Sequence, residues 1–199
     1  MYKFNFNSLL RTVVYLIVFV FYTHGIPLWG STSPSDIVSK YCKLDYNGER
    51  TPIGDINKMD DYMKDGKDYD EPGWDRFIIV SEYKVLEENY NGDGTVTIPV
   101  EYTILATLNS SPQLVLEQKK NIKVENITLV KVNDTWKIKK YIIFPRISPG
   151  SAIKLVNGWC NEIKNKSIYQ GEKLDNKRKN DLLYNLNDMI KKINRLDSN

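Results

Sequence analysis

The sequence predicts an α+β domain: a bent antiparallel sheet of four or more long strands, packed on N-terminal helices and followed by a C-terminal helical extension. Three observations predict this fold. Apolar residues recur at three- and four-residue steps after residue 33, which is helical spacing. Between residues 76 and 147 the spacing changes to two, and turn signals divide the runs. Helical spacing then returns to the end of the chain.

The first 25 residues have the pattern of a secretory signal peptide. Lys3 and Arg11 flank a charged lead, an apolar run covers residues 13–22, and residues 23–27 break it. Ten apolar residues span about 15 Å as a helix, half of a bilayer core, so an uncleaved anchor is the alternative. We expect residues 1–25 to be a signal peptide, residues 26–33 a linker, and the protein to be secreted or periplasmic.

The predicted core domain, residues 34–147, opens with a helix. Ser33 can cap it, Pro34 suits the first helical position, and Asp36 favours the positive end of the helix dipole. Its apolar face contains Ile37, Val38, Tyr41, Cys42 and Leu44. Asn47-Gly48 ends this helix, and Thr51-Pro52 predicts a second one with apolar positions at Ile53, Ile56, Met59, Tyr62 and Met63. Residues 60–75 are rich in acids and glycine and predict a surface loop.

Four runs with strand character follow, at residues 76–90, 95–108, 114–132 and 136–147. They are separated by turn signals at residues 91–94, 109–112 and 133–134. The order predicts an antiparallel meander, curved and packed by helices on one face.

Residues 148–199 predict the C-terminal helical extension. Ser148-Pro149 repeats the helix start, and its inner stripe is Ala152, Val156, Trp159, Cys160 and Ile163. A last helix over residues 180–196 has its apolar stripe at Leu182, Leu183, Leu186, Met189, Ile190, Ile193 and Leu196. Three interpretations of that stripe stay open: packing on the domain's own core, contact with a second copy or another protein, and binding to a membrane surface.

The composition excludes several functions. The net charge is +3, and Lys3 and Arg11 carry two of those charges, so the mature chain has too little basic excess for nucleic-acid binding. The single histidine, His24, lies at the edge of the signal segment. Histidine-based catalysis and imidazole metal sites are therefore not expected, and we predict no metal and no cofactor.

The two cysteines, Cys42 and Cys160, predict a disulfide in an oxidising compartment. The alternative is a pair of buried, reduced thiols that pack as small apolar groups. Acidic residues between 60 and 75 are dense enough to suggest calcium, but their order lacks that of a calcium loop, so a solvated loop is preferred. Asn-x-Ser/Thr sequons occur at Asn109, Asn126, Asn133 and Asn165, and they matter only in a eukaryotic secretory pathway.

Amphipathic helices followed by a long meander that ends in a turn–Trp–strand, residues 132–138, resemble the nuclear transport factor 2-like superfamily (NTF2-like). The resemblance covers residues 33–147. It implies a bent sheet wrapped around N-terminal helices, with a pocket at the open end of the cone. The two helices after the last strand depart from that pattern. Members include enzymes, small-molecule binders and scaffolds, so the fold does not decide the function.

In such a cone the candidate pocket residues are Tyr41, Asp45, Tyr83, Tyr102 and Tyr141. The leading hypothesis is an exported, non-catalytic domain that binds a small apolar ligand or a protein partner, homodimers included. The first alternative is a small hydratase- or isomerase-type enzyme that uses an Asp–Tyr pair. The second is an anchored subunit of an envelope complex, which contacts the membrane only if the N-terminal segment stays uncleaved.

Overall fold

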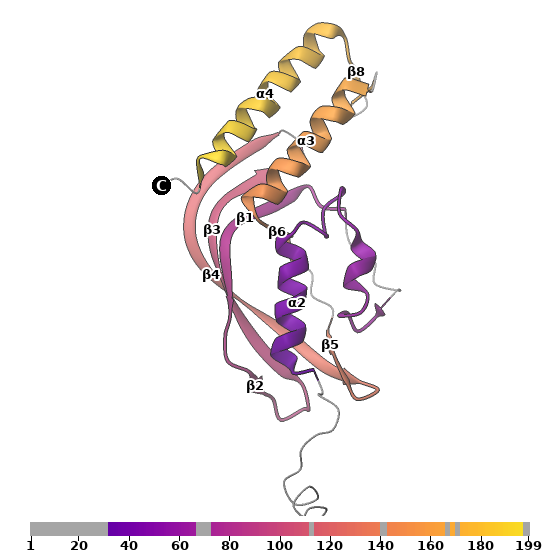
Figure 1. Ribbon diagram of the computed structural model, residues 1–199, viewed down its shortest axis with the longest axis vertical. Helices are drawn as coiled ribbons and strands as arrows, with labels where there is room; N and C mark the ends of the chain where they lie inside the picture. The colour runs from indigo at the N-terminus through magenta and orange to yellow at the C-terminus, as the bar shows by residue number, and fades with distance from the viewer. Residues whose placement is uncertain are drawn as a thin grey trace, which may run out of the picture. The chain divides into compact units, whose positions relative to one another are not determined.

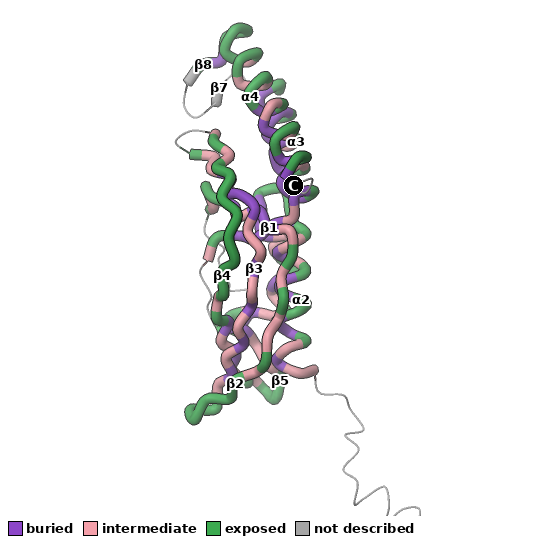
Figure 2. The backbone as a smooth tube through the Cα atoms, turned by 90° about the vertical axis from the view of Figure 1, so that its left-hand side faces the viewer, coloured by how far each residue is buried: buried purple, intermediate pink, exposed green. Residues whose placement is uncertain are grey.

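The computed structural model describes residues 32–66, 73–111, 114–139, 143–165, 168–169 and 172–196. Within them, a curled mixed sheet has helices on one of its faces, which confirms the predicted α+β fold class (Figures 1 and 2). Residues 1–31, with the predicted signal peptide and most of the linker, lie outside the described residues, as does Tyr141. In the part of the chain that is described, no helix has the length and apolar character needed to cross a membrane.

The sheet has strand order β5-β4-β3-β1-β6, with β2 added on β3. Its long strands are β1 (Arg76–Val85), β3 (Val96–Asn109) and β4 (Val115–Val132); β2 is Asn89–Tyr90. The prediction of a fourth long strand over residues 136–147 is wrong. That run forms two short strands, β5 (Thr135–Ile138) beside β4 and β6 (Arg146–Ile147) parallel to β1, at opposite sides of the sheet.

Irregular pairing accompanies the bend of the sheet. Between the pairs Ile104–Asn121 and Ala106–Gln118, β4 has two residues where β3 has one, which is a β-bulge. The pairing of β1 with β3 also shifts on both sides of Val80. Bulges of this kind bend a strand and increase its twist. The three long strands therefore curl around the helices (Figure 1).

The helix starts follow the predicted capping chemistry. Ser33 and Asp36 form a capping box at the start of α2 (Pro34–Tyr46). At α3 (Pro149–Asn165), the Ser148 hydroxyl accepts from the Ser151 N–H at 3.0 Å. The last helix, α4 (Asn176–Asn194), begins four residues before the predicted start at 180, because Asp175 caps it. A short hairpin of β7 (Ile168–Tyr169) and β8 (Glu172–Lys173) separates α3 from α4.

The second predicted helix, after Thr51-Pro52, is wrong. Only the single turn η1 (Ile56–Met59) forms there. The Thr51 hydroxyl donates to the Gly48 carbonyl at 2.7 Å, and the Gly54 N–H donates to the Thr51 carbonyl at 2.9 Å, so consecutive turns replace the helix. Met59 and Met63 are nevertheless buried, while Ile53 is half exposed.

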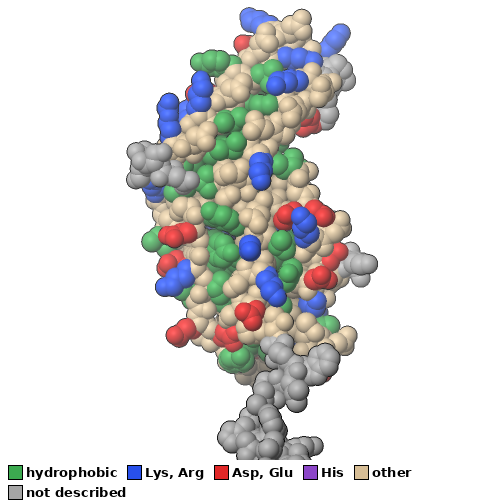
Figure 3. All heavy atoms as spheres, viewed as in Figure 1, with side chains coloured by type: hydrophobic (Ala, Val, Ile, Leu, Met, Phe, Trp, Pro, Cys, Tyr) green, Lys and Arg blue, Asp and Glu red, His purple; other side chains and the backbone are tan. Residues whose placement is uncertain are grey.

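Two hydrophobic cores lie along the same side of the sheet. The first joins α3 and α4 to one end of the sheet, and its members include Phe77, Ala106, Leu108, Trp159, Cys160, Leu186 and Ile193. The second joins α2 to the other end, and its members include Val38, Tyr41, Cys42, Ile98, Tyr102, Ile127 and Leu129. The apolar stripe of α4 thus packs on the protein's own core, while its Lys and Arg side chains gather at the surface over α3 and α4 (Figure 3).

The predicted disulfide is not formed, since Cys42 and Cys160 are both free and buried. Cys42 lies in the core under α2, whereas Cys160 lies in the core under α3 and α4. Both cysteines are on core-facing helix stripes, as the spacing predicted, but those stripes belong to different cores. The alternative interpretation, two buried thiols, describes the structure.

Candidate functional site

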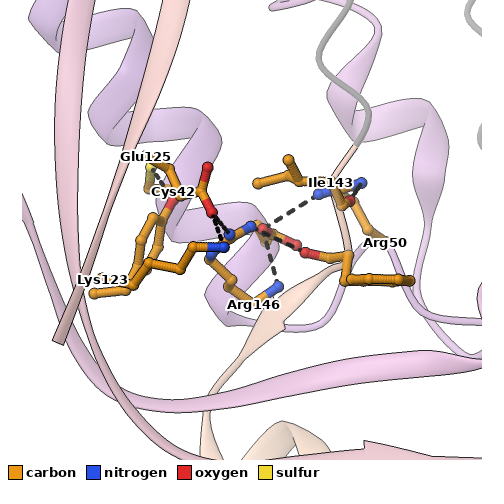
Figure 4. Close-up of polar contacts among 9 residues, drawn as sticks. Cys42, Arg50, Lys123, Glu125, Ile143 and Arg146 are labelled. Atoms are coloured by element: carbon orange, nitrogen blue, oxygen red, sulfur yellow. Dashed lines mark hydrogen bonds and ion pairs between the residues drawn. The ribbon is translucent and has the colours of Figure 1, made fainter. Parts of the chain in front are cut away.

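Four charged side chains meet between α2 and the sheet: Asp45, Arg50, Glu125 and Arg146, here called the buried polar cluster (Figure 4). Three of them are almost fully buried, with exposed fractions of 1% for Asp45, 3% for Arg50 and 4% for Arg146. Asp45 comes from the end of α2 and Arg50 from the turn after it, whereas Glu125 comes from β4 and Arg146 from β6. Distant segments of the chain therefore build the cluster.

Asp45 is the centre of this cluster. Its Oδ2 atom lies 3.4 Å from Arg50 Nη1 and accepts the Arg146 backbone N–H at 3.1 Å. Arg50 also donates through Nη2 to the Ile143 carbonyl at 2.7 Å. Its guanidinium lies 5.9 Å from the Tyr41 ring centre and 5.5 Å from that of Trp74. The Asp45 carboxylate is therefore paired with an arginine that also donates a hydrogen bond to a backbone carbonyl and packs against two aromatic rings.

Arg146 connects β6 to β4. Its Nη2 atom donates to Glu125 Oε1 at 2.9 Å, Nη1 donates to the Phe144 carbonyl at 3.1 Å, and the guanidinium lies 4.6 Å from the Tyr102 ring centre. The same Glu125 oxygen is 2.7 Å from Lys123 Nζ, at the half-exposed rim of the cluster. Arg146 Nε is buried and has no hydrogen-bond partner among the described residues. The cluster is thus compensated in charge, and it opens towards solvent at Lys123.

The cysteine and the tyrosine of this region are poor nucleophiles. Cys42 Sγ lies 3.4 Å from the Tyr102 hydroxyl. Burial raises the pKa of the Cys42 thiol to about 12, against a smaller lowering by the bond to Tyr102. Burial also raises the pKa of Tyr102 well above its ordinary value. Both groups stay protonated at neutral pH, so neither is prepared for nucleophilic or general-base chemistry.

Four of the five predicted pocket residues do come together. Tyr41, Tyr102 and Tyr83 pack in or against the core under α2, and Asp45 lies one helical turn beyond Tyr41. The Tyr83 ring centre is 6.4 Å from that of Tyr102 and 5.8 Å from that of Tyr46. Sequence reasoning missed Arg50, Glu125 and Arg146. The available signal was a charge inside an apolar run, since Arg146 follows Phe144-Pro145 and precedes Ile147.

Two surface depressions lie away from this cluster. One, of about 220 Å³, lies between the start of β4 and α4, and its lining includes Leu114, Leu116 and Met189. The other, about 600 Å³ and widely open, lies along residues 84–89 and Pro99. The first is smaller than the ~300–1,000 Å³ of usual ligand pockets, and the second encloses little. Within the described ranges, no group of acids and cysteines could hold a metal ion.

The outer edge of β4 is a different kind of site. Along residues 115–127, β4 pairs with β3 on one side, and no described strand pairs with it on the other. β5 covers only residues 129–132, and the Lys139 N–H extends that cover to the Thr128 carbonyl at 2.8 Å. Three apolar side chains of this strand are exposed, Val115 by 37%, Ile122 by 65% and Val124 by 50%. An uncovered edge offers backbone donors and acceptors to another strand.

No family model, curated protein or solved structure matches this chain.

Proposed function

We propose that this protein is an exported, non-catalytic domain that binds a protein partner, built on an NTF2-like fold. The observation that carries the proposal is the contrast between the two candidate sites. The buried polar cluster is packed and compensated in charge, whereas no described strand covers the outer edge of β4 along residues 115–127, which presents exposed apolar side chains.

The pairing of Asp45 argues against the enzyme alternative. An Asp–Tyr pair of the hydratase or isomerase type needs a carboxylate that faces substrate and exchanges a proton near neutral pH. Asp45 Oδ2 instead faces Arg50 Nη1 and accepts the Arg146 backbone N–H. Tyr41, its neighbour on α2, is 1% exposed and lies under the Arg50 guanidinium. This arrangement stabilises the contact of α2 with the sheet.

The exposed strand supports protein binding over small-ligand binding. Peptides and strands of other proteins bind sheet edges through main-chain hydrogen bonds, and side chains on alternate positions give specificity. Ile122 and Val124 occupy alternate positions and so lie on one face of β4. Such a surface fits a protein, because a small apolar ligand needs an enclosing cavity.

Site-specific photo-crosslinking in the producing cell tests the proposal. A photoreactive amino acid at Ile122 should give a discrete protein adduct in the exported fraction. The matched control position is Tyr184, which is 76% exposed and belongs to α4, not to β4. An adduct at position 122 that is absent at 184 supports the proposal. Equal labelling at both positions, or none at 122, contradicts it.

A further inference from the structure

The uncovered edge of β4 is not uniform along its length. Its upper part contains Lys119 and Lys120 in the β-bulge opposite Leu105. Lysines and bulges are devices that protect sheet edges from pairing. Its lower part is covered from Thr128 onwards by the segment that contains β5. Between these two ends, residues 121–127 form a regular strand whose outer edge pairs with no other described strand, and we call them the open segment.

The open segment is self-complementary. Its two charged residues, Lys123 and Glu125, have opposite signs and flank Val124. If two copies pair antiparallel about a two-fold axis at Val124, then Lys123 lies opposite Glu125 of the second copy, twice. Val124 meets Val124 of the second copy, and Ile122 lies opposite Asn126. Opposite charges at directly facing positions stabilise a strand pair, and like charges destabilise it.

Neighbouring registers are disfavoured by the same charges. An axis at Lys123 places that lysine opposite itself, and an axis at Glu125 places that glutamate opposite itself. In the symmetric register, the Glu125 Oε1 atom already accepts from Lys123 and Arg146 of its own chain. Its second oxygen has acceptor capacity for Lys123 of the second copy, because a carboxylate can accept about four hydrogen bonds.

We infer that the partner bound at the β4 edge is a second copy of this chain, paired antiparallel through residues 121–127 with the two-fold axis at Val124. The pairing joins two sheets into one continuous sheet across the dimer. This inference names a partner for the surface described above and so rests on the proposed protein-binding function.

Disulfide trapping in the full chain tests the register. In the inferred dimer, two copies of position 124 face each other with Cα atoms about 4.5–5.5 Å apart, within the range of a disulfide. Two copies of position 122 are four residues out of register, about 13 Å apart. Val124→Cys should therefore give most of the chain as a covalent dimer under mild oxidation. Ile122→Cys, exposed on the same strand, is the matched control and should stay monomeric.

The unsubstituted chain shows the background from the native thiols, which are buried. A second variant, Lys123→Glu, removes the Lys123–Glu125 ion pair within each chain and places glutamates opposite each other across the dimer, so its dimer should dissociate about tenfold more readily. Circular dichroism checks that each variant is folded.

Equal trapping at positions 122 and 124, or a monomeric Val124→Cys chain, overturns the inference. If that monomer still gives a photo-adduct with a different protein at position 122, the protein-binding function stands without the dimer. If neither trapping nor an adduct is seen, both fail.

Discussion

Asp45→Asn tests whether the buried polar cluster stabilises the fold. The change preserves the shape of the side chain but removes the negative charge that faces Arg50, whose side chain is fully buried. Losing one partner of a buried ion pair costs about 3–5 kcal/mol, because the other charge stays buried and uncompensated. The lower end applies, because the Nη1–Oδ2 distance of 3.4 Å is long, and Arg50 retains the Ile143 carbonyl and two aromatic rings.

We therefore expect the free energy of unfolding to fall by about 3 kcal/mol, and Tm by roughly 6–12 °C for a chain of this length. Urea unfolding of the wild-type and variant chains, followed by circular dichroism, measures the loss in free energy of unfolding, and a thermal melt measures the loss in Tm. The control is Asp188→Asn, which removes a shorter ion pair, 2.8 Å to Lys192, at the surface, where both side chains are about half exposed. That change should leave the midpoint unmoved, since solvent screens exposed pairs. If the two variants lose equal stability, burial does not determine the strength of the Asp45 pair.

Three further predictions follow from the packing and the backbone. Burial raises the pKa of the Cys42 thiol from 9.0 to about 12. As the pH rises above 9, the thiol of the unfolded chain therefore loses its proton while the thiol of the folded chain keeps it. The free energy of unfolding should then decline by about 1.4 kcal/mol per pH unit. Urea midpoints at stepped pH check the slope, which should flatten in Cys42→Ala. Ile193→Ala, at 0% exposure, should cost about 2–5 kcal/mol, whereas Tyr184→Ala should cost little; equal losses would mean that α4 is not docked. Asp134, with φ of 61° in the two-residue turn before β5, should gain stability on Asp134→Gly in the same assay, because glycine adopts a positive φ without a Cβ clash.

Local chemistry made much of the fold predictable. The Ser33–Asp36 capping box, the Ser148 start of α3 and the turn at residues 133–134 are set by residues close in sequence. The split of residues 136–147 between two sides of the sheet was not predictable in this way. That run mixes apolar residues with Lys137, Lys139, Lys140 and Arg146, and nothing local indicates that the chain leaves β4 after β5 and reaches β1 at β6.

In the candidate site too, only the features that depend on residues close in sequence were predictable. Tyrosines at strand and helix positions were predicted to line the concave side, and Tyr41 and Tyr102 do lie there. Their charged neighbours depend on contacts between distant segments, such as the Asp45–Arg146 hydrogen bond across 101 residues. The missing disulfide has the same origin: helical spacing gives the face of a cysteine, but not which of two cores that face meets.

Native mass spectrometry of the protein, recovered from its own host without reduction, tests the inferred dimer. We predict a dimer without a retained small molecule, in which every cysteine is a free thiol. A monomer with a bound small molecule would contradict it and would return the concave side of the sheet to consideration as a ligand pocket.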